Sequence, residues 1–202
     1  MAKLIYTIGH STLTMEEFIH LLKLHSVDVV ADVRSNPYSR YQPQFNRESL
    51  HRNLRGSGLD YVFLGAELGA RSTDPNCYLD GRVQYDRLAL APGYLRGIDR
   101  LIAGSKSHTI AIMCSEKEPL ECHRTVLVAR SLIERSTDVS HILFDGAVET
   151  HDATLSRLLR EWNMPEDELF RTRSEILEEA LKRQEQKIAY IDKDMKVMGE
   201  PA

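Results

Sequence analysis

The sequence has no long hydrophobic run, few cysteines and few aromatic residues. None of its apolar runs reaches the roughly 18 to 20 residues that cross a bilayer. Its first residues lack the long apolar segment and cleavage site of a secretory signal. The chain has 202 residues and only 3 cysteines, an odd number, which argues against a disulfide scaffold. We therefore expect a cytoplasmic protein with reduced thiols and no membrane partner.

Three common phosphate and nucleophile motifs are also missing. The sequence contains no GxGxxG, no GxxxxGK[ST] and no GxSxG. A dinucleotide-binding fold, a P-loop NTPase and a nucleophile-elbow hydrolase thus lack their usual signature. The formal net charge is -4, so the molecule as a whole does not attract nucleic acid.

Short β-type runs alternate with segments of helical periodicity, which is typical of parallel βαβ construction. We predict an α/β domain over residues 1–160, with one open, mostly parallel sheet of about five strands and helices on both faces. The expected strands are Leu4–Ile8, Val27–Val33, Leu59–Leu64, His108–Cys114 and Val139–Phe144. The expected helices run from Thr14 to about His25, over Asn46–Leu54, over parts of Tyr85–Ala103 and over Cys122–Arg135.

A change of composition at Pro165 predicts a helical appendage over residues 165–195. The segment is rich in Glu, Lys, Arg and Gln. Its apolar residues have helical spacing and are Leu169, Ile176, Leu177, Ala180, Leu181 and Ile188. Because such a stripe must be covered, a homodimer through this helix is one possibility.

Polar residues directly after the predicted strands are the first candidates for a site. In an open parallel sheet, ligands collect beyond the carboxyl ends of the strands. His10 and Ser11 follow the first strand, and Asp32 and Arg34 end the second. Arg71 follows the third strand, and Cys114 and Glu116 follow the fourth. We expect these side chains to share one crevice.

The triplet Cys122-His123-Arg124 is the most informative part of the chain. A cysteine at a helix N-terminus beside Arg124 and His123 should have a lowered pKa, which suits a nucleophile. Cys114 would supply a second thiol. A buried, inert role is the alternative for each cysteine, and it is favoured for Cys77.

Zinc is a further alternative, because Cys114, Cys122 and His123 are suitable donors. The chain has no Cys-x2-Cys pair, however. In a helix, the side chains of adjacent residues such as Cys122 and His123 do not easily point at one ion. We therefore predict no metal and no cofactor.

One basic segment stands out from the acidic background. Residues 34–55 carry five Arg and one Glu, with Tyr38, Tyr41 and Phe45 between them. Arginine with aromatic rings suits a nucleotide or a single-stranded nucleic acid. A solvated surface is the alternative.

Several motifs together resemble a known family. They are Thr7-Ile-Gly9-His10-Ser11, Asp32-Val-Arg34-Ser-x-Pro37-x-Ser39-Arg40, Gln44-Phe45-Asn46, Leu68-Gly69-x-Arg71, Met113-Cys114-x-Glu116 and Cys122-His123-Arg124. Over roughly residues 4 to 145, the chain resembles the bacterial and archaeal domain-of-unknown-function family four-eight-eight. The resemblance implies a compact α/β domain without an established role. Ala70 departs from the family pattern, in which a second Gly often precedes the Arg.

These observations favour an enzyme acting on a phosphorylated or nucleotide-like anionic molecule. The candidate catalytic residues are Cys122, Cys114, His10 and Glu116. The candidate binding residues, including those that only the resemblance implies, are Ser11, Asp32, Arg34, Arg40, Phe45, Arg71, His123 and Arg124. The alternative function is a nucleic-acid-binding module that uses the segment Arg34–Arg55 without catalysis.

Overall fold

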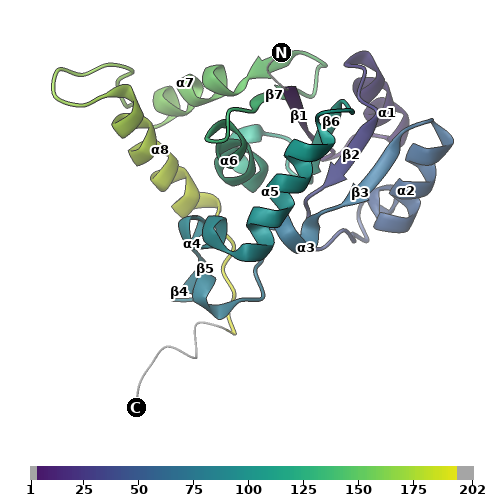
Figure 1. The fold of residues 1–202 in the computed structure, drawn as a ribbon, viewed down its shortest axis with the longest axis horizontal. Helices are drawn as coiled ribbons and strands as arrows, with labels where there is room; N and C mark the ends of the chain where they lie inside the picture. Colours follow the sequence, from purple (N-terminus) through teal and green to yellow (C-terminus); the bar gives the residue numbers. More distant parts are fainter. Residues whose placement is uncertain (1–3, 195–202) are drawn as a thin grey trace.

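A six-stranded sheet with the strand order β3-β2-β6-β1-β7-β8 forms the centre of the protein, as the computed structural model shows (Figure 1). The structure describes residues 4–194. The first three residues, which form part of the segment examined for a secretory signal, lie outside it. Residue 195, the last of the expected appendage, also lies outside it. Strands β3, β2, β6, β1 and β7 are parallel, and β8 pairs antiparallel with β7. The predicted α/β class is confirmed, with one strand more than expected.

The elements follow one another in the alternation that the sequence predicts. The sheet strands are β1 (Leu4–Gly9), β2 (Val29–Asp32), β3 (Asp60–Phe63), β6 (Ile110–Cys114), β7 (Asp138–Ile142) and β8 (Val148–Thr150). The helices are α1 (Met15–Leu24), α2 (Arg47–Gly56), α3 (Gly65–Leu68), α4 (Tyr85–Leu90), α5 (Pro92–Gly104), α6 (Arg130–Ile133), α7 (His151–Glu161) and α8 (Arg173–Ile188). A small hairpin, β4 (Tyr78–Leu79) and β5 (Arg82–Val83), lies between α3 and α4.

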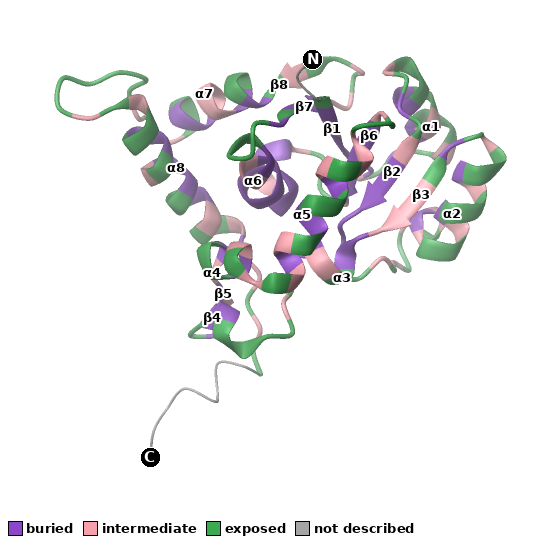
Figure 2. Ribbon diagram, in the orientation of Figure 1, coloured by how far each residue is buried: buried purple, intermediate pink, exposed green. Residues whose placement is uncertain are grey.

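Helices cover both faces of the sheet, as expected. On one face, Phe18 of α1 and Leu50 of α2 pack with Val30 of β2. On the other face, Ile98 of α5 and Leu132 of α6 belong to a second, larger core. Figure 2 shows buried residues concentrated along β1, β2 and β6 and around α6. Alternate strand residues thus serve two separate cores.

The carboxyl ends of three neighbouring strands lie level with one another. In the parallel register, Gly9 lies opposite Cys114 and Asp32 lies opposite Met113. The turn after β1 then bonds to the loop after β6, with the N–H of Ser11 donating to the carbonyl of Ser115 at 2.9 Å. A Cβ on Gly9 would lie 1.8 Å from the Glu116 carbonyl oxygen, so only glycine allows this approach.

The helix expected over Cys122–Arg135 begins later. A 3-10 turn, η3 (Pro119–Glu121), precedes Cys122, whose backbone is extended (φ -137°, ψ 139°). A π-helical segment, η4 (Arg124–Ala129), then continues into α6. Cys122 is therefore not a helical residue.

The C-terminal helix also begins later than its composition suggests. It starts at Arg173, where Thr172 and Glu175 form a capping box. Its buried residues Ile176, Leu177, Ala180 and Leu181 join the larger core of the same chain. The apolar stripe is thus covered within the chain, which removes the reason for expecting a dimer.

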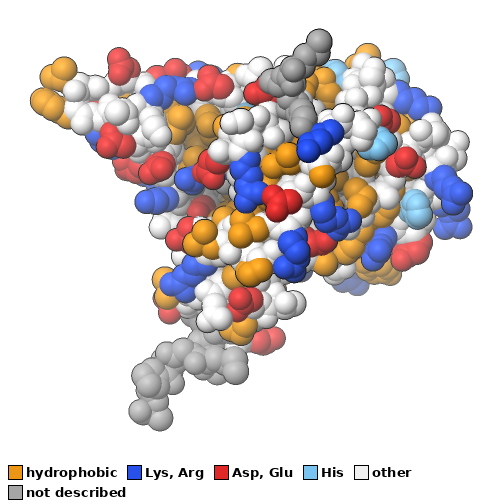
Figure 3. Space-filling model, in the orientation of Figure 1, with side chains coloured by type: hydrophobic (Ala, Val, Ile, Leu, Met, Phe, Trp, Pro, Cys, Tyr) orange, Lys and Arg blue, Asp and Glu red, His pale blue; other side chains and the backbone are white. Residues whose placement is uncertain are grey.

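Leu169 does not belong to that stripe. It lies with Phe170 in the loop between α7 and α8, where the two side chains are 88% and 91% exposed. This loop projects from the body of the molecule in Figure 1, and hydrophobic side chains are visible at its tip in Figure 3. Within residues 4–194, no helix has the length and apolar character to span a membrane.

Candidate thiol site

A cavity of about 230 Å³ opens at the carboxyl edge of the sheet. Arg34 reaches it from the end of β2 and Cys114 from the end of β6. Cys122 and His123 line it from the loop before η4. The segment after α8 contributes Tyr190. Of the residues expected to share one crevice, Arg34, Arg71, Cys114 and Glu116 line this cavity, whereas His10, Ser11 and Asp32 do not.

Two thiols and one imidazole lie close together in the lining of this cavity. We call this cluster, Cys114, Cys122 and His123, the thiol site. His123 Nδ1 lies 3.8 Å from Cys114 Sγ and 3.8 Å from Cys122 Sγ. All three donor atoms lie within 4.8 Å of one another. The extended backbone of Cys122, followed by a helical His123, brings both side chains to the same point.

The other nitrogen of His123 fixes the ring. His123 Nε2 lies 3.2 Å from the carbonyl oxygen of Val33, which can only accept a hydrogen bond. The Nε2 atom is therefore protonated, and Nδ1 carries the lone pair in the neutral ring. Nδ1 can take a proton from either thiol.

The environment separates the pKa values of the two thiols. A hydrogen bond to the Cys122 sulfur, together with burial, raises the pKa of Cys114 well above its ordinary value. Burial alone would raise the pKa of Cys122. The hydrogen bond from Cys114 and the charge of Arg124, however, bring the pKa of Cys122 well below the ordinary value. The pair therefore favours a thiolate on Cys122 and a neutral thiol on Cys114.

Asp32 and Arg34 form a buried ion pair beside the cavity, which Arg34 lines and Asp32 does not. Arg34 Nη2 donates to Asp32 Oδ2 at 2.7 Å and Arg34 Nε to Asp32 Oδ1 at 2.9 Å. Tyr61 donates its hydroxyl proton to the same carboxylate. Arg34 also donates to the Phe45 carbonyl at 2.8 Å and contacts His10 Nε2 at 3.2 Å. Of its five N–H groups, one on Nη1 remains for a ligand.

His10 lies behind Arg34 rather than in the cavity lining. Its Nε2 faces Arg34, and its Nδ1 lies 3.2 Å from the Ser11 carbonyl. The ring stacks on Phe45 with centroids 4.2 Å apart. Burial, together with the charge of Arg34, lowers the pKa of His10 to about 4. His10 is thus neutral at neutral pH, with both ring nitrogens engaged by protein groups.

Arg124 and Glu116 border the thiols on the side of β1. Arg124 is fully buried and donates to the carbonyls of Glu116 (2.7 Å) and Lys117 (3.2 Å). Glu116 lines the cavity. Partial burial and the nearby Cys122 raise the pKa of Glu116. Arg124 thus holds the loop that carries Glu116 in place.

Of the remaining predicted residues, Arg71 lines the cavity, and Arg40, Phe45 and Ser11 do not. Arg71 is exposed, lines the cavity and stacks over Tyr190 at 4.5 Å. Arg40 is exposed and lies 5.4 Å from the Tyr41 ring, outside the cavity lining. Phe45 is fully buried. Ser11 takes a positive φ of 39° in the turn after β1.

A metal ion has three suitable donors here: Cys114, Cys122 and His123. We expected that the side chains of Cys122 and His123 could not point at one ion, because we took Cys122 to be helical. Its backbone is instead extended. Two sulfurs and one nitrogen are ligands that Zn²⁺ accepts, and three protein ligands leave one position open. Among the described residues, the cluster contains no fourth His, Cys, Asp or Glu donor.

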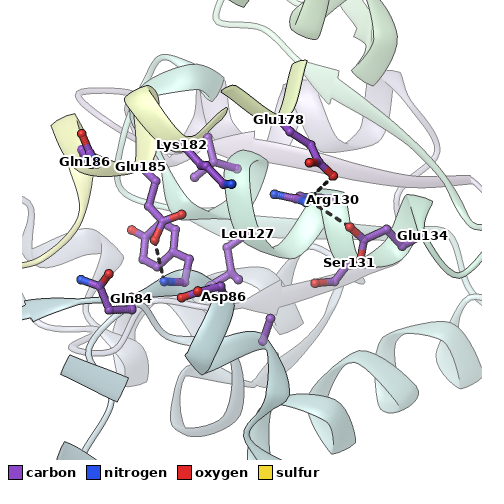
Figure 4. A pocket seen from close by; sticks show the side chains of 13 residues that line it. Gln84, Asp86, Leu127, Arg130, Ser131, Glu134, Glu178, Lys182, Glu185 and Gln186 are labelled. Atoms are coloured by element: carbon purple, nitrogen blue, oxygen red, sulfur yellow. Dashed lines mark hydrogen bonds and ion pairs between the residues drawn. The ribbon is translucent and has the colours of Figure 1, made fainter. Parts of the chain in front are cut away.

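The sequence motifs did not predict part of the lining, namely Tyr85, Ile188 and Tyr190. Tyr85 also borders a second cavity, of about 510 Å³, between α4, η4 and α8. Figure 4 shows this second cavity with Glu178 and Glu134 directed toward Arg130. Tyr85 opens α4, and the other two residues follow or end α8. These three residues belong to no polar motif of the sequence. Their position in the lining follows only from how α4 and α8 pack in the folded chain.

A family model described as "Domain of unknown function DUF488" matches residues 14–131. The chain belongs to this DUF488 family. The matched region contains Asp32, Arg34, Cys114 and the Cys122–Arg124 triplet, whereas His10 and the α8 segment lie outside it. Searches of curated proteins and of solved structures gave no match. Membership in DUF488 therefore specifies a family and no reaction.

Proposed function

We propose that the protein is an enzyme that uses Cys122 as a nucleophile toward a small anionic substrate, such as a phosphorylated molecule. The observation that carries this proposal is that Cys122, Cys114 and His123 meet in the lining of one cavity. A thiolate needs nearby positive charge or a proton acceptor to be reactive at neutral pH. Arg124 and His123 provide both.

The other residues receive supporting roles in this proposal. The remaining N–H of Arg34 and the guanidinium of exposed Arg71 would bind the anion. His10 would position Arg34 rather than transfer protons, because both of its nitrogens are engaged. Glu116, with its raised pKa, would donate a proton to the leaving group.

The size of the cavity favours a small substrate over a nucleotide. Ligand sites for drug-sized molecules usually enclose about 300–1,000 Å³. The cavity of about 230 Å³ lies below that range, so a nucleotide would extend beyond it. A small molecule that carries a phosphate or carboxylate group is the better fit.

A nucleic-acid-binding role has less support. Arg34, the first arginine of the basic segment, is only 5% exposed and paired with Asp32. Arg47 stacks over the Phe63 ring at 4.3 Å. Arg34 is thus not part of an exposed basic surface, which leaves four arginines of the segment to contact a phosphate backbone.

Alkylation at neutral pH tests the proposed nucleophile. The reduced protein is treated with iodoacetamide, and each labelled cysteine is identified by mass spectrometry. We expect Cys122 to react at least tenfold faster than free cysteine, because its lowered pKa increases the fraction of thiolate. Inorganic phosphate should slow the reaction, and R71A should weaken that protection.

Cys77 provides the matched control, because it is buried and lies outside the thiol site. The C77S variant should label like the wild type, whereas C122S should lose the fast reaction. Metal analysis of the purified protein excludes a bound ion as the cause of a slow reaction. If metal-free Cys122 reacts no faster than a free thiol, the proposed function is wrong.

A further inference from the structure

Cys114 has no assigned step in the proposed function, although it lies as close to His123 as Cys122 does. Both sulfur atoms are 3.8 Å from the same Nδ1 atom, and both residues line the cavity. A group attached to Cys122 in the cavity therefore remains within reach of a second thiol. A single-nucleophile mechanism does not require this arrangement.

We propose that Cys114 and Cys122 act as a dithiol pair that reduces the S–S bond of a small disulfide, with Cys122 attacking and Cys114 resolving. This inference rests on the proposed function, in which Cys122 is the nucleophile, and it adds the class of bond that is attacked. It also makes His123 the group that carries the proton of Cys114 to the second leaving group.

The first step is an attack of the Cys122 thiolate on one sulfur of a disulfide X–S–S–X. The bond between Cys122 Sγ and that sulfur forms, and the original S–S bond breaks. X–S⁻ leaves and takes a proton from Glu116, which regains one from water. The product on the protein is a mixed disulfide at Cys122. Because the cavity holds the attached group next to Cys114, the second thiol is already in position.

The second step releases the other half of the substrate. Cys114 gives its proton to Nδ1 of His123, and its thiolate attacks Cys122 Sγ. A Cys114–Cys122 disulfide forms, and the second X–S⁻ leaves with the proton from His123. The substrate gains two electrons from the two sulfur atoms, one proton from Cys114 and one proton from water by way of Glu116, to give two X–SH. An external dithiol reductant would return the pair to its starting state.

The backbone around the two cysteines is consistent with Cys122 as the attacking thiol and Cys114 as the resolving thiol. Cys114 is the last residue of a central, fully buried strand, and its carbonyl accepts from the His10 N–H at 3.0 Å. Cys122 lies outside regular helix, between η3 and η4. The resolving thiol is thus on the rigid element, and the attacking thiol is on a loop at the cavity.

Stoichiometric reaction with a small disulfide tests the inference. Reduced, metal-free protein is mixed with 3,3′-dithiodipropionate, and released thiol and protein mass are measured. We expect the wild type and C77S to release two thiols per chain and to lose two hydrogen atoms in mass, with a peptide linking Cys114 to Cys122. C114S should release one thiol and retain the attached group on Cys122.

The possible failures are distinguishable. If Cys122 is alkylated rapidly, but the wild type stops at the mixed disulfide and behaves like C114S, the dithiol inference is wrong and the proposed nucleophile stands. If neither iodoacetamide nor the disulfide reacts with Cys122, the proposed function fails as well. C114A serves as a second variant, so that a folding defect of C114S does not decide the result.

Discussion

The backbone N–H of Tyr85 donates to the carboxylate of Glu185 at 2.6 Å, which ties the start of α4 to the C-terminal helix α8. Burial raises the pKa of Glu185 at this contact. Tyr85 lines both cavities, and the chain after Glu185 continues to Tyr190 at the thiol site. The C-terminal helix thus completes the site, although it lies outside the part matched by the family model.

Replacing Gln184 by alanine should destabilise the docked helix. The fully buried Gln184 side chain accepts from Trp162 Nε1 at 3.0 Å and donates to the Leu120 carbonyl at 2.9 Å. Q184A leaves the Trp162 N–H and the Leu120 carbonyl without these hydrogen-bond partners. We therefore expect the free energy of unfolding in urea to fall by about 2 kcal/mol or more. Exposed Gln186 on the same helix is the control, and Q186A should change it by less than about 0.5 kcal/mol. Equal effects of the two substitutions would contradict this docking of α8.

Gly9 should not tolerate a side chain. The Cβ of G9A would meet the Glu116 carbonyl at 1.8 Å and Arg124 Nη2 at 3.1 Å. We expect a loss of unfolding free energy at the upper end of the 1–3 kcal/mol typical of overpacking, or about 3 kcal/mol. Gly56 ends α2, and a Cβ there would have no neighbouring atom within 4 Å, so G56A should be neutral or stabilising by about 0.5–1 kcal/mol. Urea denaturation of both variants checks this difference.

The buried histidines should make the fold sensitive to acid. Burial lowers the pKa of His151 to about 4, and His151 Nδ1 contacts His141 Nε2 at 3.1 Å. An unfolded histidine binds a proton below about pH 6.5. Between about pH 6.5 and 4 the unfolded chain therefore binds more protons than the folded chain. Stability falls with decreasing pH, by about 1.4 kcal/mol per pH unit for each such histidine.

Urea denaturation at several pH values measures that slope. H151Q should reduce it by about 1.4 kcal/mol per pH unit, because one titrating group is lost. H20Q, at an exposed position on α1, is the control for the replacement of a histidine by glutamine. A slope that is the same in the wild type and H151Q would show that His151 is not held neutral by the fold.

The sequence predicts the sheet well because its signals are local. The run from Ile110 to Cys114 is continuously apolar, as a central parallel strand requires, and all five residues are buried. The start of α8 was predictable from Thr172 and Glu175, whose spacing is that of a capping box, but the change of composition at Pro165 suggested an earlier start. The eighth strand is short and pairs at the edge, where periodicity gives little signal.

The site was less predictable because it depends on backbone direction and on tertiary packing. The polar positions after β2 and β6 could be found from the chain alone. The meeting of Cys122 and His123 at one point could not, because it requires the extended backbone of Cys122. The place of Tyr190 depends on how α8 docks, which no local pattern shows.

Titration of the thiols by their thiolate absorbance tests the central claim most directly. Reduced, metal-free wild type and C122S are compared over a range of pH, with C77S as the control. We expect one thiol of the wild type and of C77S to ionise well below the ordinary pKa of about 8.5, and C122S to lack this thiolate. If all thiols of the wild type ionise at or above the ordinary pKa, Cys122 is not a reactive thiolate and the proposed function is contradicted.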